Sequence, residues 1–269
     1  MSASSPGSAE WCNRYGPWAV VTGATSGIGE AIARQLAAHG LDVVLIARGA
    51  ERLHAIAAEL EARDRVRTLV VPADLATPDG LDLVETATGA LDVGLFVAAA
   101  GFGTSGHFLR SGLGAELDML DVNCRAVLVH AHHFGRRLAV RRRGGIVLLG
   151  SIVAHQGVPY AAHYSATKAY VQTFSEALHL ELAPLNVDVL VSSPGPVHSG
   201  FAARAGMTMS AAVEPRVVAR ATIRALGRRG TVVPGALSKL LTYSLTPLPR
   251  WARSRIMGAI MRDMTRQGA

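Results

Sequence analysis

The chain has 269 residues, of which 49% are hydrophobic, enough apolar content for the core of one large α/β domain. Its formal net charge is +7, but the basic residues are scattered and aromatic residues make up only 5%, which argues against a nucleic-acid surface with base-stacking platforms. Cys12 and Cys124 lie outside any paired motif, so we expect neither a disulfide framework nor a metal site.

The first sixteen residues are expected to form a flexible tail. Residues 1–10 are rich in Ser, Ala, Gly and Pro, and they lack the basic start and apolar centre of a signal peptide. No apolar run in the chain approaches the roughly 20 residues of a membrane-spanning helix. These features predict a soluble, cytoplasmic protein.

A glycine-rich turn follows the first predicted strand, residues 18–21. Backbone N–H groups at a strand-to-helix junction point at phosphate, and glycines let the backbone approach it closely. The spacing Gly-x-x-x-Gly-x-Gly differs from the commoner dinucleotide fingerprint, but its position before a helix over residues 30–39, ended by Gly40, predicts a nucleotide site. The turn is Thr22-Gly23-Ala24-Thr25-Ser26-Gly27-Ile28-Gly29.

The second predicted strand, residues 42–46, is expected to run parallel to the first and to end beside the adenosine ribose of such a nucleotide. An NAD site usually has an acid there for the ribose 2′-hydroxyl, whereas this chain has Ala47 followed by Arg48. A cation at this position suits a 2′-phosphate and predicts NADP. The alternative is a surface arginine at the start of the next helix, residues 50–63.

Two later strands end at the same predicted edge. Residues 66–71 form a third strand followed by Asp74 and Leu75. Asp74 either accepts from an adenine amino group or caps the helix that follows. Residues 93–98 form a fourth strand followed by Ala99-Ala100-Gly101-Phe102-Gly103, whose small residues either lie against a ligand or form a simple turn.

Asn123 lies inside a long helix predicted over residues 117–140. Asparagine is mildly disfavoured in a helix interior, so its presence needs a reason, either packing or function. His130, His132 and His133 lie on the same helix, but no i, i+4 pair with a nearby carboxylate is evident. A helix face that packs against another subunit is therefore favoured over a metal site.

Ser151, Tyr164 and Lys168 are the candidate reacting groups. Ser151 follows the fifth predicted strand, residues 146–149, at the edge where ligands bind in parallel sheets, and its hydroxyl can donate to a carbonyl oxygen. Tyr164 and Lys168 are four residues apart on a helix over residues 164–183, so they share one face. An unperturbed phenol has a pKa of about 10, and a neighbouring ammonium is expected to lower that pKa toward the working range.

The chain after this helix continues the alternation of strands and helices. A sixth strand over residues 187–191 is followed by the segment Pro194-Gly195-Pro196-Val197-His198-Ser199. A last core helix is predicted over residues 215–226 and a short edge strand over residues 231–233.

The C-terminal segment is apolar, Met-rich and basic. Residues 237–245 and 251–264 are separated by Pro247 and Pro249. Three roles are consistent with this composition: a lid over an apolar substrate, a helix on a membrane surface, or a packing or subunit-contact segment.

In order and spacing, these motifs resemble those of the short-chain dehydrogenase/reductase family. The resemblance covers roughly residues 17–230. It implies an α/β fold: a doubly wound parallel sheet (Rossmann-like), in strand order 3-2-1-4-5-6-7, as a single catalytic domain over residues 17–233 with a helical C-terminal extension over residues 234–269. The matching motifs are Thr22–Gly29, Asp74-Leu75, Asn123, Gly150-Ser151, Tyr164–Lys168 and Pro194-Gly195.

The resemblance also implies roles for these residues. Ser151 and Tyr164 would hydrogen-bond the substrate oxygen, and Lys168 would lower the pKa of Tyr164 and bind the nicotinamide ribose. Asn123 would hold a water that connects Lys168 to solvent, and Ser199 stands where the family's loop over the nicotinamide usually has Thr. The expected cofactor-binding residues are Gly23, Thr25, Ser26, Gly27, Ile28, Gly29, Arg48, Asp74, Leu75, Ala99, Gly101, Tyr164, Lys168, Pro194, Gly195, Val197 and Ser199.

One departure from the family pattern follows the fourth strand. The family usually has Asn-Asn-Ala-Gly there, whereas this chain has Ala98-Ala99-Ala100-Gly101. Those amides normally tie neighbouring strands and shape the cofactor floor. Their loss is expected either to loosen the sheet or to alter the nicotinamide pocket.

Together these features predict an NADP(H)-dependent oxidoreductase that interconverts a carbonyl and a secondary alcohol. It is expected to work as a reductase on an apolar ketone or 3-oxoacyl substrate. The alternative is an NADP-binding regulatory or sensor protein with little catalysis, for which Ala98-Ala99 is the only support. A small-molecule partner and a homo-oligomer, dimer or tetramer, are expected, as is usual for the family.

Overall fold

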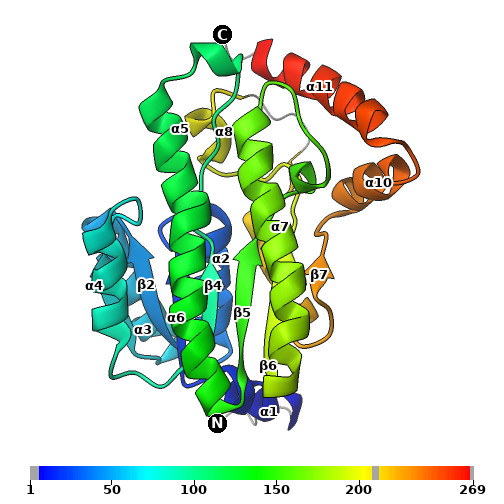
Figure 1. Ribbon diagram of the computed structural model, residues 1–269. Coiled ribbons are helices and arrows are strands. Elements are labelled where there is room, and N and C mark those ends of the chain that lie inside the picture. The colour runs from blue at the N-terminus through cyan, green and yellow to red at the C-terminus, as the bar shows by residue number, and fades with distance from the viewer. Residues whose placement is uncertain (1–5, 208–211, 267–269) are drawn as a thin grey trace.

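The structure, a computed structural model, describes residues 6–207 and 212–266. Its centre is a seven-stranded sheet in the order β3-β2-β1-β4-β5-β6-β7, in which all neighbouring strands run parallel (Figure 1). The predicted fold class and strand order are confirmed. The strands are β1 (Trp18–Thr22), β2 (Asp42–Ala47), β3 (Thr68–Pro72), β4 (Val93–Ala98), β5 (Gly144–Leu149), β6 (Val187–Ser192) and β7 (Thr231–Val232).

Helices cover both faces of the sheet, and each face has its own apolar core. Along β1, Ala19 and Val21 pack into one core, whereas Val20 packs into the other. Because both faces are buried, the central strands are continuous apolar runs rather than alternating ones. The first core is closed by α2 (Gly27–Ala38), α3 (Ala50–Asp64) and α9 (Pro215–Ala225), and the second by α4 (Pro78–Thr88), α6 (Ala126–Arg141) and α7 (Ala162–Leu182).

Two helices differ from their predicted limits in ways that affect the site. The helix after the glycine turn begins at Gly27 rather than at Glu30, so the last glycines of the turn form its first helical turn. The helix predicted over residues 117–140 is α5 (Leu113–Leu120), a π-helical segment η2 (Asp121–Arg125), and then α6. Such widened turns often occur at functional sites, and this one contains Asn123.

The N-terminal segment is not a loose tail over the part that the structure describes. Residues 6–15 form helix α1 (Pro6–Tyr15), and Tyr15 is only 2% exposed. Its hydroxyl donates to Asp188 Oδ2 at 2.6 Å, and Arg14 Nε donates to the same oxygen at 2.6 Å. The expected flexible tail over residues 1–16 is therefore wrong for residues 6–15, because a buried aromatic ring and an ion pair dock them on the domain; residues 1–5 lie outside the described part.

The sheet remains paired where the family's two asparagines are replaced. The backbone N–H groups of Ala99 and Ala100 both donate to Thr22 Oγ1, at 3.0 Å each. This hydroxyl ties the end of β1 to the segment after β4. The strand β4 stays paired with both β1 and β5, so the sheet is intact at this point, and an altered nicotinamide pocket stays a prediction.

The C-terminal extension consists of α10 (Ala236–Leu245) and α11 (Arg250–Arg266), which lie beyond the carboxyl ends of the strands (Figure 1). Ser238 attaches α10 to the domain, because its buried hydroxyl accepts from Gly195 N at 3.1 Å. No helix in the described part of the chain is long and apolar enough to cross a membrane. The short elements are η1 (Phe108–Arg110), η3 (Ile152–His155), η4 (Ala183–Leu185) and α8 (Phe201–Arg204).

Tyr15→Phe should lower the free energy of unfolding by about 1–3 kcal/mol, since it removes a hydrogen bond to a carboxylate. Urea unfolding monitored by circular dichroism measures this difference. Tyr243→Phe is the matched control: Tyr243 is 64% exposed on α10, so its change should stay within about 0.5 kcal/mol. Equal stability of the two variants would show that the docking of α1 contributes little.

Candidate active site

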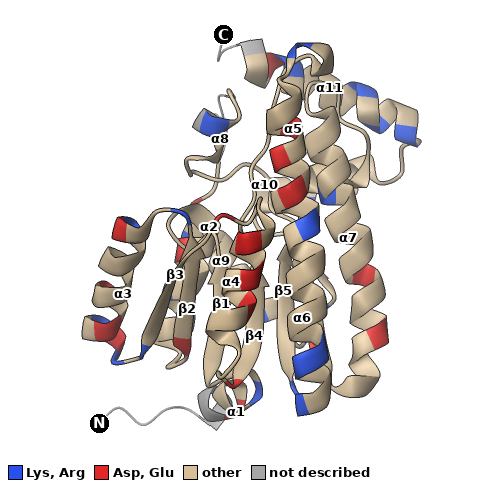
Figure 2. Ribbon diagram, turned by 60° about the vertical axis from the view of Figure 1, so that its left-hand side comes forward, with Lys and Arg blue, Asp and Glu red and all other residues tan. Residues whose placement is uncertain are grey.

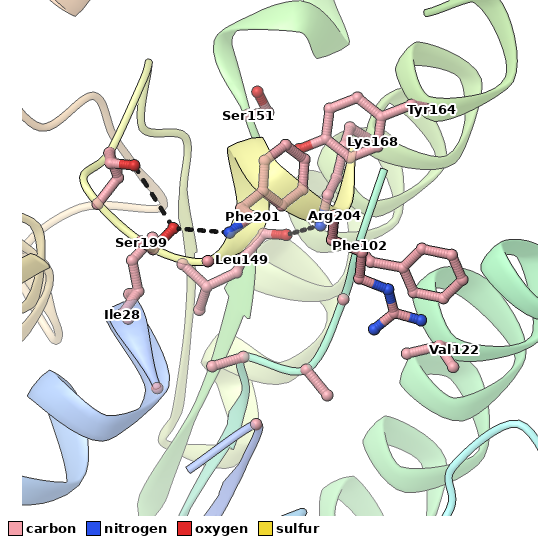
Figure 3. A pocket seen from close by; sticks show the side chains of 18 of the residues that line it. Ile28, Phe102, Val122, Leu149, Ser151, Tyr164, Lys168, Ser199, Phe201 and Arg204 are labelled. Atoms are coloured by element: carbon pink, nitrogen blue, oxygen red, sulfur yellow. Dashed lines mark hydrogen bonds between the residues drawn. The ribbon is translucent and has the colours of Figure 1, made fainter. Parts of the chain in front are cut away.

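A cavity of about 690 Å³ lies at the carboxyl ends of the strands. Every predicted cofactor-binding residue lines it, as does Ser151, whereas Asn123 does not. Figure 3 shows part of its wall, where the strand ends, the glycine turn, α7 and the segment after β6 meet. One end of the cavity is made of glycine backbone and polar groups, and the other end of apolar side chains from the C-terminal extension.

The glycine turn makes the polar end of the cavity narrow, because backbone segments pack closely against each other there. Gly23 has a φ of +66°, and a Cβ there would lie 2.8 Å from Ala100 N; a Cβ on Gly29 would collide with the Gly23 carbonyl oxygen. Only glycine fits such a packed turn. The first turn of α2 then directs free N–H groups toward the cavity, an arrangement that suits a dinucleotide's pyrophosphate.

Arg48 and Asp74 line the same end from the loops after β2 and β3. Asp74 is not the cap of α4. Thr77 is the N-cap, and its hydroxyl accepts from Gly80 N at 3.1 Å. Asp74 Oδ1 accepts from Ala76 N at 3.1 Å, which holds the loop in place, and the carboxylate borders the cavity where an adenine could lie.

The three candidate reacting groups meet at the centre of the cavity wall (Figure 3). Ser151 follows β5, and its Oγ accepts from Val153 N at 3.4 Å. Lys168 donates from Nζ to the backbone oxygen of Leu149 at 2.7 Å and lies 5.9 Å from the centroid of the Tyr164 ring. Tyr164 and Lys168 are both buried, so their charged forms are costly.

The pKa of Tyr164 moves in the direction opposite to the prediction. Burial raises it to about 12, and a hydrogen bond with Ser151 offsets only part of this rise. Burial also lowers the pKa of Lys168 to about 8. The expectation that the ammonium brings the phenol into the working range is wrong for the protein alone, because desolvation dominates and the ammonium donates to Leu149.

Asn123 uses its side-chain amide within the protein. Its Oδ1 accepts from Phe102 N at 3.2 Å, and its Nδ2 donates to Phe102 O at 2.9 Å and to Thr167 Oγ1 at 3.0 Å. The residue is fully buried. Asn123 therefore holds the segment after β4 against α7, which is the packing role considered above. The expected water beside it stays a prediction.

Two of the three histidines of α6 make contacts within the chain, whereas His132 is exposed, and the subunit contact expected of this helix face stays a prediction. His130 is buried between Phe96 and Phe134, and burial lowers its pKa to about 4. His133 lies 3.1 Å from Glu85. Within residues 6–207 and 212–266, no group of three or more His, Cys, Asp or Glu side chains could hold a metal ion.

Several wall residues come from a loop that sequence spacing could not place. The guanidinium of Arg204 lies 3.7 Å from the centroid of the Phe102 ring, and the ring of Phe201 lies 5.3 Å from that of Tyr164. These contacts join α8 to the segment after β4 and to α7. They carry no local motif, and residues 208–211 of the same loop lie outside the described part of the chain.

The apolar end is formed by one face of the C-terminal extension. Met257 and Met261 are buried against Tyr164 and Phe102 in the third apolar cluster. Methionine side chains adapt to varied shapes, so this wall can accept a bulky apolar group. The lining residues from the extension are Leu241, Met257, Ile260, Met261 and Met264.

Comparisons with known proteins agree with this geometry. The sequence profile described as "short chain dehydrogenase" matches residues 17–209. A "7beta-hydroxysteroid dehydrogenase" of Clostridium sardiniense is 31% identical over 230 residues, which are 84% of this chain and 88% of that protein. An "Inactive hydroxysteroid dehydrogenase-like protein 1" of Mus musculus is 35% identical over 222 residues, covering 80% of this chain and 67% of that protein.

Among solved structures, a short-chain dehydrogenase from Sphingobium yanoikuyae in complex with NADPH is similar over nearly the whole chain. The two are 29% identical, the match covers 90% of this chain and 95% of that one, and the TM-score is 0.79.

In the cofactor-free protein, Tyr164 should remain neutral at pH values where an ordinary tyrosine ionises, about 10, because burial raises its pKa. The phenolate absorbance of the wild type minus that of Tyr164→Phe isolates this one group during a pH titration. We expect no difference signal until the pH is well above that of an exposed tyrosine. A midpoint near neutrality would contradict the burial argument.

Proposed function

The chain belongs to the short-chain dehydrogenase/reductase family, and from this premise we propose that it is an NADP(H)-dependent oxidoreductase that interconverts a ketone and a secondary alcohol. The observation that carries the proposal is that Ser151, Tyr164 and Lys168 line one cavity, between a glycine-lined cradle and an apolar wall. A proton donor is thus located where a carbonyl bound beside a nicotinamide would have its oxygen.

The nicotinamide would supply hydride chemistry at the carbonyl carbon. Ser151 would donate a hydrogen bond to the carbonyl oxygen and hold it in place. Tyr164 would transfer its phenolic proton to that oxygen as negative charge develops there. Lys168, held by the Leu149 carbonyl, would stabilise the resulting phenolate and bind the nicotinamide ribose, and Asn123 would support a water path to solvent.

The raised pKa of Tyr164 supports work in the reducing direction. A phenol with a pKa of about 12 is almost entirely protonated at neutral pH, which is the form that donates a proton. Oxidation would instead require the phenolate as the base. NADPH, the cofactor in the related Sphingobium yanoikuyae structure, would serve the same direction.

Arg48 supports NADP as the cofactor. It lines the cavity after β2, where the adenosine ribose would lie, and Asp74 and Leu75 line it after β3. A guanidinium binds a phosphate through charge-assisted hydrogen bonds. Burial lowers the pKa of Arg204, and the positive charge of nearby Arg48 lowers it further. A 2′-phosphate would relieve that repulsion.

The apolar end of the cavity supports a bulky apolar ketone as substrate. The methionines of α11 and Leu241 of α10 form its wall, so the extension acts as a lid. The Clostridium sardiniense relative acts on a hydroxysteroid by its name, a substrate of that size and polarity. Homo-oligomer formation stays a prediction.

A sensor function with little catalysis is the second candidate, because one relative is named inactive. Against it, Ser151, Tyr164 and Lys168 are all present on one cavity wall, and the segment after β4 is held to β1 by the Thr22 hydroxyl. Catalysis is the function that this arrangement favours.

Tyr164→Phe should lower kcat with a responsive ketone and NADPH by on the order of 10²- to 10⁴-fold, because it removes the proton donor. The affinity for NADPH, measured by fluorescence titration, should change little. Tyr170→Phe makes the same change on the exposed side of the same helix and should keep full activity. Near-normal turnover by Tyr164→Phe would refute the assignment.

Arg48→Gln should weaken NADPH binding by roughly 10- to 100-fold, the value of a hydrogen bond to a charged group, and should leave NADH binding nearly unchanged. Isothermal titration with both cofactors measures the two affinities. Arg220→Gln on the exposed face of α9 controls for net charge. No preference of the wild type for NADPH over NADH would contradict the role of Arg48.

A further inference from the structure

The C-terminal extension has two different faces. Its inner face lines the cavity, with Leu241 on α10 and Met257 and Met261 on α11. Its outer face exposes large apolar side chains: Trp251 and Leu240 are each 65% exposed. The outer apolar residues are Leu237, Leu240, Tyr243, Trp251 and Ile256.

The outer face is also strongly basic. Lys239, Arg250, Arg255 and Arg262 are exposed on it, and Arg255 lies 5.4 Å from the Trp251 ring centroid. From residue 215 to residue 266 the sequence contains a single acidic residue, Asp263 near the end of α11. Figure 2 shows the basic residues of α11 gathered at this end of the molecule.

We propose that this outer face of α10 and α11 binds the surface of an anionic lipid bilayer. Interfacial helices combine basic residues with Trp and Leu and bury their apolar side chains at the boundary between headgroups and acyl chains. Trp and Tyr favour that depth, since each has an apolar ring and a polar group. Each Lys or Arg near the surface adds attraction to anionic lipid.

Charge argues against a second copy of the chain as the occupant of this face. A twofold interface places the same patch on both subunits. It would therefore bring Lys239, Arg250 and Arg255 of both copies together, and within the described part of α10 and α11 Asp263 is the single carboxylate that could offset them. The partner that complements the outer face of the extension is therefore an anionic, partly apolar surface.

Bound in this way, the lid would lie between the bilayer and the cavity. An apolar ketone dissolved in the bilayer would then reach the cavity by displacement of the lid, without crossing water. This consequence depends on the proposed function, whereas lipid binding itself does not.

The test uses the full chain and two kinds of vesicle: phosphatidylcholine alone, and phosphatidylcholine mixed with phosphatidylserine. We expect co-flotation with the mixed vesicles, weaker at high salt, and little with phosphatidylcholine alone. Trp fluorescence should shift to the blue on binding, and Trp251→Phe should abolish the shift, since Trp251 is the exposed tryptophan of the face.

Replacing Lys239, Arg250 and Arg255 together by Gln should weaken binding to the mixed vesicles on the order of 100-fold, from the contribution of each cation near an anionic surface. The matched control replaces the exposed Arg216, Arg220 and Arg224 of α9 by Gln, which gives the same net charge. The control should bind nearly as the wild type does. Both variants should keep the wild-type melting temperature.

Three results would overturn the proposal: no flotation with mixed vesicles, equal loss in both triple variants, or a concentration-dependent dimer that Leu240→Ser with Trp251→Ser dissolves. None of these readouts needs catalysis. Lipid binding without ketone reduction would refute the proposed function and leave this inference intact. Ketone reduction without lipid binding would refute this inference and leave the proposed function intact.

Discussion

The hydrogen bond from Lys168 to the Leu149 carbonyl holds together the part of the fold that carries the candidate reacting groups. It joins α7 to the end of β5 at 2.7 Å inside the protein. Ser151 follows Leu149 by two residues, and Tyr164 lies one helical turn before Lys168, so the contact joins the two segments that carry these hydroxyls. The same burial that makes this bond strong keeps the phenol protonated.

The wall around these groups is assembled from segments that are distant in sequence, and a few polar side chains join them. Thr22 ties β1 to the segment after β4, and Asn123 ties that segment to α7. Ser238 ties the loop after β6 to α10. All of these links are made at the carboxyl edge of the sheet, where they hold the backbone segments around the cavity together. A parallel sheet that is buried on both faces leaves this edge as the place for ligands.

The C-terminal extension connects the cavity with the molecular surface. Each of the two helices buries one side against the domain and exposes the other, so the same short segment shapes the apolar wall and presents a basic, apolar outer face. The proposed lipid binding and the proposed access of substrate therefore involve the same structural element. The family fold provides the edge of the sheet where the candidate reacting groups lie, and the extension adds the apolar wall beside them.

The sequence alone determined the fold class, the strand order implied by the family motifs, and the residues that line the polar end of the cavity. Those features depend on local periodicity, on turn chemistry and on motif spacing, all of which can be read from the order of the residues. Only the tertiary structure decided that Tyr15 docks on Asp188, that Arg204 lies over Phe102, and that burial raises the pKa of Tyr164. Each of these depends on which distant groups surround a side chain and exclude water from it, and that information exists only once the chain has folded.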